Sequence, residues 1–228
     1  MPKKTKTRSS KGNSSIGLWL VGGGFVIVVL IVVLINWSNS QAIQASTQID
    51  VPVAWQNRNV LGDPNAPVTV EAWEDFLCPS CGQWTSTVEP KLIEDFIKTG
   101  KAKFVYQYFP LSSHGPGATL GAMAAECAAD QGAFWPYHGV LFQVAASQGA
   151  SGFTVERLIS QAETANLDSR TFTQCMTGQK YRTKIQESVN QATNTLRLTG
   201  TPSVIVDGRL LENAFDYAAI SSLIEQGQ

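Results

Sequence analysis

The chain has 228 residues, a formal net charge of −1 and four cysteines, and its charges are unevenly distributed. Five of its 17 basic residues precede residue 12 with no acidic residue among them, so the remainder carries 12 basic against 18 acidic residues. Contact with nucleic acid needs a clustered basic face, so the acidic body argues against a nucleic-acid binder. A basic leader in front of an acidic body instead indicates a signal for membrane topology.

Residues 16–37 form an uncharged segment rich in Val, Ile and Leu. As a helix this segment would span roughly 33 Å, close to the thickness of a bilayer core. Because the basic leader, residues 1–15, lies on its N-terminal side, the positive-inside rule predicts a cytoplasmic N-terminus. We therefore predict a single-pass anchor in the cell membrane, with the rest of the chain outside the cytoplasm, in a periplasm or on the outer face. The alternative is a cleaved signal peptide, whose apolar region would be shorter.

Residues 38–59 are rich in Ser, Gln, Asn and Thr, and they are expected to form a flexible linker. A folded domain over 60–228 then begins with a buried strand at 68–73 and a helix that reaches about residue 98 with a kink at Pro90. A second buried strand follows at 104–109. The later elements are helices near 117–130, 134–146, 154–165, 168–177 and 180–196, a hairpin of 203–206 with 209–212, and a helix at 217–226. This order predicts an α/β fold with a helical insertion.

The motif Cys78-Pro79-Ser80-Cys81 follows the first buried strand and opens a helix. Thiol–disulfide exchange needs a thiolate that attacks and a second thiol that resolves the mixed disulfide. Cys78 is expected at the helix N-cap, where free N–H groups and the helix dipole stabilise a thiolate. Pro79 suits the first helical position, and Cys81, one turn further on, is expected to face the interior. The motif therefore predicts an exposed nucleophile at Cys78, with a lowered pKa, and a resolving thiol at Cys81.

A structural disulfide and half of a zinc site are the alternative interpretations of this motif. Zinc needs four ligands, but the sequence has no second C-x-x-C pair, and both histidines, His114 and His138, lie far downstream. The position of the motif between a buried strand and a kinked helix favours a redox function.

The segment from Glu74 through Cys78-Pro79-Ser80-Cys81, together with Gly200-Thr201-Pro202, resembles the DsbA-like family of thioredoxin-fold oxidoreductases. The resemblance covers about residues 60–226 and implies a thioredoxin-like fold with a helical insertion near 114–196. It implies a redox-active disulfide as the reactive group, with no other cofactor. It also implies that Thr201 and a cis Pro202 pack against the active site and offer backbone hydrogen bonds to an extended substrate.

The sequence departs from this family at two positions. Relatives often carry a buried acid six residues before the first cysteine, where this chain has Ala72. Either Glu71 or Glu74 could substitute, although the simpler expectation for both is a place on the surface. Ser80 adds only a weak hydroxyl donor where the strongest oxidants of the family have histidine, so the resemblance leaves the oxidising strength open.

Cys127 and Cys175 both fall in the helical insertion. Similar pairs form a second disulfide in some relatives, so the resemblance implies a structural bridge between them. Two buried free thiols and a regulatory pair are the alternatives.

The remaining candidates near the motif have simpler structural explanations. His114 could tune Cys78, but a helix-entry or surface position is the simpler expectation, and His138 is expected to pack in the core. Trp73, Phe76 and Trp84 could line a groove for unfolded peptide, although core packing is the simpler expectation for each.

The preferred function is a thiol–disulfide oxidase that introduces disulfides into reduced, unfolded extracytoplasmic polypeptides. It would act as a monomer and be reoxidised by a quinone-linked partner in the membrane. One alternative is a membrane-tethered reductase or isomerase supplied with electrons across the membrane. A second alternative is a non-enzymatic module that binds metal through its thiols, although copper carriers of this fold usually add a histidine ligand and use a C-x-x-x-C pair.

Overall fold

The computed structural model describes residues 29–31, 33 and 50–227. The chain divides into two units, Met1–Gln44 and Ala45–Gln228. Within the described residues, no helix is both long enough and apolar enough to cross a bilayer. The predicted anchor at 16–37, apart from residues 29–31 and 33, lies outside the described residues, as does most of the predicted linker.

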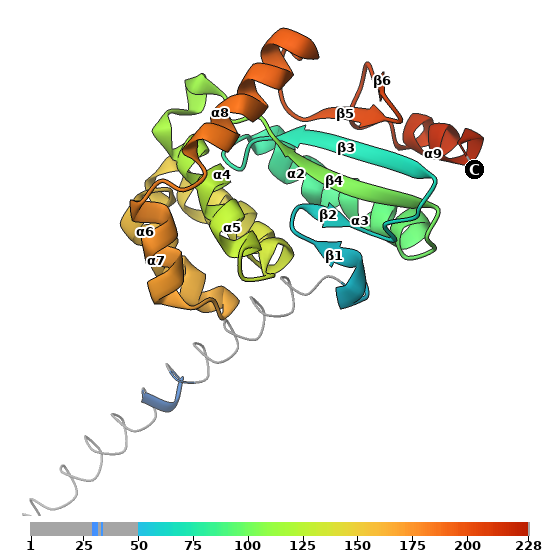
Figure 1. Cartoon of the computed structure of the whole chain (residues 1–228). Helices are drawn as coiled ribbons and strands as arrows, with labels where there is room; N and C mark the ends of the chain where they lie inside the picture. The colour runs from blue at the N-terminus through green and yellow to red at the C-terminus, as the bar shows by residue number, and fades with distance from the viewer. Residues whose placement is uncertain (1–28, 32, 34–49, 228) are drawn as a thin grey trace, which may run out of the picture. The chain divides into compact units, whose positions relative to one another are not determined.

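A six-stranded sheet forms the centre of the second unit, with the order β1-β2-β4-β3-β5-β6. Its central strands, β3 (Val68–Glu74) and β4 (Ala102–Tyr108), run parallel, and every other pair is antiparallel. The outer strands are β1 (Gln56–Asn57), β2 (Val60–Leu61), β5 (Ser203–Val206) and β6 (Arg209–Leu210). Figure 1 shows β3 and β4 crossing the middle of the domain.

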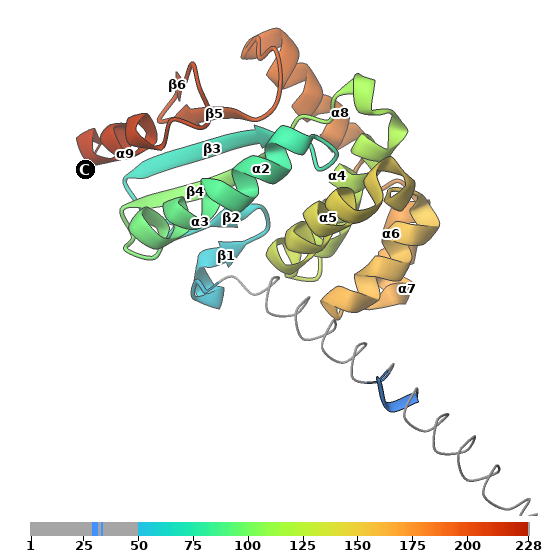
Figure 2. The same cartoon turned by 180° about the vertical axis from the view of Figure 1, so that it is seen from behind.

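Side chains alternate across the sheet as the period of two requires. Val68, Val70 and Ala72 of β3 join the main hydrophobic core, whereas Trp73 joins a smaller cluster on the opposite face. The main core also holds Trp84 of α2 (Pro79–Thr87), which lies with α3 (Glu89–Leu92) over the two central strands (Figure 2). The smaller cluster is completed by Phe109, Ala192, Leu198 and Ile205.

The predicted kink at Pro90 is confirmed as a break between two helices. Helix α2 ends at Thr87, and α3 carries Pro90 in its first turn, where its missing N–H costs little. A π-helical turn, Ile93–Ile97, continues the segment to the predicted end near Lys98.

The helical insertion lies between β4 and β5. Its α-helices are α4 (Pro116–Ala129), α5 (Phe134–Gln148), α6 (Val155–Ala162), α7 (Ser169–Thr177) and α8 (Arg182–Asn190). These bounds match the predicted pieces to within three residues, except that α8 ends at Asn190 and a π-helical turn, Gln191–Thr195, continues it toward the predicted end at residue 196. Helix α9 (Tyr217–Gln226) matches the predicted last helix. Figure 2 shows α5 beside α2, so the insertion flanks the helix that begins at Cys78.

The predicted linker, 38–59, is wrong at its C-terminal end. Val53–Trp55 form a 3-10 turn, and β1 pairs with β2, whose Val60 and Leu61 pair with Val105 and Phe104 of β4. Strands of two residues are too short to show an alternating pattern in the sequence, so only the pairing of β1 with β2 and of β2 with β4 reveals them.

Candidate active site at the start of helix α2

Cys78 caps the N-terminus of α2 in an extended conformation, and Pro79 occupies the first turn. A tight turn delivers the chain from β3 to this point: the Cys78 N–H donates to the Asp75 carbonyl at 3.0 Å, and the Leu77 N–H donates to the Asp75 carboxylate at 2.9 Å. The predicted place of Cys78 at the N-cap is therefore confirmed.

Cys81 lies one turn into the helix and is fully buried, as predicted, with its sulfur 3.5 Å from the Asp75 backbone nitrogen. Cys78 and Cys81 are both free thiols in this structure. Cys78 is only 8% exposed, so the prediction of an exposed nucleophile is wrong for this side chain.

The two thiols differ in acidity. The pKa of Cys78 is lowered to about 5, and the largest cause is a hydrogen bond from the Cys81 thiol. The Thr201 side chain and the backbone N–H groups of Cys81 and Ser80 lower this pKa further, whereas burial acts in the opposite direction. Burial raises the pKa of Cys81, and the hydrogen bond to Cys78 and the charge of Glu74 raise it further. The contributions of Ser80 and Cys81 are those of a helix N-terminus, whose free N–H groups favour an anion.

Thr201, in the loop that precedes β5, contacts this site. The Thr201–Pro202 peptide bond is cis, as predicted. The Thr201 carbonyl oxygen lies 3.4 Å from the Cys78 sulfur. Residues that are 123 positions apart in sequence thus meet at the reactive sulfur.

His114 lies near the motif but contacts Asp75 instead of a cysteine. Its Nδ1 is 2.7 Å from the Asp75 carboxylate, which also accepts from the Leu111 N–H at 2.9 Å. Asp75 is fully enclosed and therefore ties the turn before Cys78 to the loop before α4. This role of Asp75 was not predicted from the sequence.

The expectation that Glu74 lies on the surface is wrong, because its side chain is buried. It shares the core-facing side of β3 with Ala72, two residues earlier, so the alternation of the strand was the signal that could have placed it. Its pKa is raised well above the ordinary value by burial, and then by the charges of Glu89 and Cys78. Glu71, on the other face of the strand, accepts a hydrogen bond from Gln107 at 3.2 Å.

Two further ionisable groups lie buried behind the cysteines. Burial raises the pKa of Glu89 to about 8 and lowers the pKa of His138 to about 3. The His138 Nε2 lies 3.8 Å from the Glu89 carboxylate. The predicted core position of His138 is confirmed, but the sequence did not point to Glu89.

The aromatic residues around the motif pack in the interior, which is the simpler of the two expectations. Trp73 and Trp84 are fully buried, and the Trp84 indole N–H donates to the Ala214 carbonyl at 2.9 Å. Phe76 is also buried, with its ring 5.0 Å from that of Phe142. Both of these phenylalanines line a pocket of about 670 Å³ that opens beside Cys78 and Pro79.

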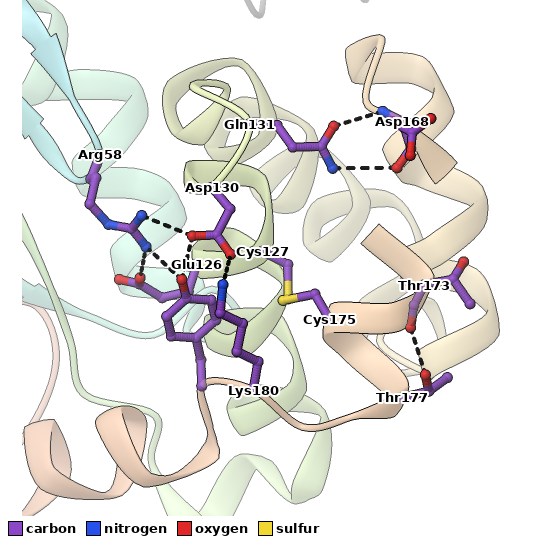
Figure 3. The surroundings of a disulfide bond; sticks show 11 residues. Arg58, Glu126, Cys127, Asp130, Gln131, Asp168, Thr173, Cys175, Thr177 and Lys180 are labelled. Atoms are coloured by element: carbon purple, nitrogen blue, oxygen red, sulfur yellow. Dashed lines mark hydrogen bonds and ion pairs between the residues drawn. A yellow bond between two sulfur atoms is a disulfide. The ribbon is translucent and has the colours of Figure 1, made fainter. Parts of the chain in front are cut away.

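Cys127 of α4 and Cys175 of α7 form a disulfide across 48 residues, with their Cα atoms 5.9 Å apart. The second predicted pair is therefore bonded, and Figure 3 shows it beside a cluster of ion pairs. In that cluster, Arg58 pairs with Glu126 and with Asp130, and Lys180 pairs with Asp130 at 2.7 Å. These contacts join the β1–β2 hairpin to the insertion.

Comparison with known proteins agrees with this geometry. Residues 56–226 match the family model described as Thioredoxin. A probable disulfide bond formation protein D of Bacillus anthracis is 30% identical over 72% of this chain and 76% of its own length. The crystal structure of oxidised BdbD from Bacillus subtilis superposes with a TM-score of 0.68 at 28% identity, covering 75% of this chain and 92% of that one.

A longer protein also contains a matching segment. A Na(+)/H(+) antiporter NhaA 1 of Salinispora arenicola is 34% identical over 76% of this chain. This chain spans only 25% of the antiporter's length.

A thioredoxin-like fold with paired thiols at a helix N-terminus, facing a cis-proline loop, defines a thiol–disulfide oxidoreductase. The chain belongs to the thioredoxin family and, within it, to the DsbA-like oxidoreductases.

Proposed function

We propose that the chain is an oxidase that transfers its Cys78–Cys81 disulfide to reduced client polypeptides. A client thiolate attacks the Cys78 sulfur, the Cys78–Cys81 bond breaks, and Cys81 leaves as a thiolate that takes up a proton. A second client thiolate then attacks the client sulfur of the mixed disulfide, and Cys78 leaves as a thiolate. Two electrons pass from two client thiols to the cysteine pair, so the reaction needs no other cofactor.

The observation that carries this proposal is the contrast between the two thiols at the start of α2. Cys78 ends each cycle as the leaving thiolate, and its pKa of about 5 makes it a good leaving group. Stabilising the reduced form makes a disulfide a stronger oxidant. The expected reduction potential lies between about −100 and −220 mV, more oxidising than thioredoxin.

The neighbouring residues would assist this exchange in different ways. Pro79 begins the helix without an unpaired N–H, and the Ser80 N–H stabilises the Cys78 thiolate. Thr201 and Pro202 would hold an extended client segment beside Cys78, since the Thr201 carbonyl already lies at its sulfur.

The basic leader and the apolar segment at 16–37 support a place at the membrane. The chain would cross the bilayer once, with a cytoplasmic N-terminus and the domain outside the cytoplasm. A quinone-linked membrane partner would reoxidise the cysteine pair, and the anchor would hold the domain close to it. The domain would act as a monomer on unfolded extracytoplasmic polypeptides.

The test is refolding of a reduced, disulfide-dependent substrate by the oxidised full chain. We expect Cys78→Ala and Cys81→Ala each to abolish the activity, because neither variant can form the Cys78–Cys81 disulfide. When a client disulfide is supplied instead, we expect Cys81→Ala to accumulate mixed disulfides, because its Cys78 thiolate attacks that disulfide and no resolving thiol remains to release the client. The reduction potential then decides the direction of electron flow. A potential near the thioredoxin value of about −270 mV would overturn the oxidase direction in favour of a reductase.

A further inference from the structure

The turn between β3 and α2 contacts both reactive cysteines through the main chain of Asp75. The Asp75 carbonyl accepts from the Cys78 N–H at 3.0 Å, and the Asp75 N–H lies 3.5 Å from the Cys81 sulfur. A movement of Asp75 therefore changes the positions of the two thiols relative to each other.

The carboxylate of Asp75 fixes this turn from the side of the insertion. Its Oδ1 accepts from the Leu77 N–H at 2.9 Å, and its Oδ2 accepts from the Leu111 N–H at 2.9 Å. Oδ2 also lies 2.7 Å from Nδ1 of His114. A carboxylate only accepts hydrogen bonds, so this contact places a proton on Nδ1. Among these three partners, His114 alone donates from a side chain.

The Asp75 carboxylate is completely enclosed, whereas the His114 side chain is 25% exposed. Burying a carboxylate is costly unless it is hydrogen-bonded, so the turn is held where the three donors can reach it. Loss of the His114 donor removes one of these hydrogen bonds and frees the turn to shift toward water.

Helix α4 packs against the same turn. His114 ends a 3-10 turn, and α4 begins two residues later. In the first turn of α4, a Cβ added to Gly117 would lie 3.2 Å from Cδ1 of Leu77, the residue before Cys78. The start of the insertion thus contacts the turn directly, and the hydrogen bond between Asp75 and His114 joins the same two segments.

We propose that Asp75 and His114 are positioning residues for thiol exchange, because their hydrogen bond holds the turn where Cys81 can donate to Cys78. The inference rests on the exchange chemistry of the proposed function and holds for either direction of electron flow. The hydrogen bond from the Cys81 thiol is the largest cause of the low pKa of Cys78. A turn that shifts weakens this hydrogen bond and makes the reduced protein less stable relative to the disulfide form.

The test compares His114→Ala, which removes the donor, with His114→Asn, whose amide can donate from the place of Nδ1. The reduction potential of each full chain is measured against glutathione. We expect His114→Ala to lower the equilibrium constant for oxidation of glutathione at least about tenfold, since a hydrogen bond to a charged group is worth about this much. This change is about 30 mV for a two-electron couple. We expect His114→Asn to recover most of the loss.

The ultraviolet absorbance of the Cys78 thiolate gives a second readout. We expect its midpoint to lie about one pH unit higher in His114→Ala than in the wild type, because one pKa unit corresponds to a tenfold change. The matched control is Ser113→Ala, since Ser113 is exposed in the same 3-10 turn, and it should keep the wild-type values. A purely structural contact would lower the melting temperature and leave the potential and the midpoint unchanged.

Asp75→Asn tests the other partner. Each carboxylate oxygen faces a main-chain N–H, so the amide NH₂ meets a donor in either orientation. We expect this variant to lower the equilibrium constant at least as much as His114→Ala does. Should it not fold, the two His114 variants decide the question alone.

Three outcomes are decisive. Equal potentials and midpoints in the wild type and His114→Ala would overturn the proposal. It would also be overturned if His114→Asn behaved like His114→Ala, since the donor would then have no effect. A wild-type potential near that of thioredoxin would overturn only the oxidase direction, and a tenfold difference between His114→Ala and the wild type would still support the positioning role.

Discussion

Cys78 and Cys81 are the same residue type one helical turn apart, but their surroundings shift the pKa values of the two thiols in opposite directions. The pKa of Cys78 is lowered to about 5 from an ordinary value of 9.0, so Cys78 is a thiolate at neutral pH in the reduced protein. A depressed pKa stabilises the fold of the reduced protein fully above about pH 9, and this contribution is lost as the pH falls to about 5.

We expect alkylation of Cys78 in the reduced protein to titrate with a midpoint near pH 5 and to level off above pH 7. Cys81→Ala removes the largest cause of the low pKa, the hydrogen bond from Cys81, so its midpoint is expected at higher pH. The measurement is the rate of iodoacetamide labelling followed by mass spectrometry. A midpoint near the ordinary value in the wild type would contradict this account of the site.

Glu74 has the position and the charge to exchange a proton with Cys81. It is buried on the core side of β3, and its charge contributes to the raised pKa of the Cys81 thiol. When Cys81 attacks a mixed disulfide at Cys78, it must lose its proton, and a carboxylate that is hard to keep ionised can accept it. Such a general base typically contributes about a hundredfold or more in rate.

Glu74→Gln is therefore expected to slow the resolution of mixed disulfides by at least about tenfold. Glu71→Gln is the matched control, because Glu71 lies on the opposite face of the same strand and contacts Gln107. Single-turnover decay of a preformed mixed disulfide, followed between pH 5 and 9, measures both variants. If Glu74→Gln and the wild type decay at one rate across that range, Glu74 has no part in the proton transfer.

Helices α4 and α7 are joined covalently by Cys127 and Cys175, far along the chain from the reactive pair. Closing a loop of this length stabilises a protein by about 4 kcal/mol in the chain-entropy model. The replacement of both cysteines by Ala is expected to lower the melting temperature by roughly 5–15 °C.

Thiol exchange at Cys78 should change little in this double variant, since neither Cys127 nor Cys175 contacts Cys78. Calorimetry measures the stability, and refolding of the reduced substrate measures the exchange. The wild type with its Cys127–Cys175 bond reduced is the control and should melt near the double variant. Loss of exchange in a variant that is still folded would assign this bridge a direct part in the reaction.

The elements that the sequence predicted well are those with long, regular patterns. The helical segment after the motif was predicted to reach about residue 98, and Pro90 located its break. β1 and β2 were missed because each has only two residues. The pairing of Cys127 with Cys175 followed from family resemblance, since four cysteines allow three pairings.

The residues of the candidate site also differ in how well the sequence predicted them. Cys78, Cys81 and Pro202 were predictable because a short motif fixes their local geometry. Asp75, Glu89 and the pocket formed with Phe142 were not, since their roles depend on packing between segments distant in sequence. Burial of Glu74 was missed because the predicted strand, 68–73, ended one residue before it, so the alternation of the strand was not extended to Glu74.

At the scale of the whole molecule, the first 50 residues carry the predicted membrane topology. The basic leader and residues 16–37 predict a domain outside the membrane. Protease added to intact cells or spheroplasts is therefore expected to digest residues 60–228. A cytoplasmic marker protein that stays intact is the control, and a protected domain alongside it would overturn the predicted topology.

The order in which the chain is synthesised also affects how the disulfide between α4 and α7 forms. At about 5–20 residues per second, Cys175 emerges from the ribosome roughly 2–10 s after Cys127. Cys78 and Cys81 emerge earlier still, and shorter loops close at lower entropic cost. The order of emergence thus favours early pairing of the reactive cysteines and leaves Cys127 for its later partner. In this way, an enzyme proposed to make disulfides for other chains acquires its own second disulfide with little competition from the first.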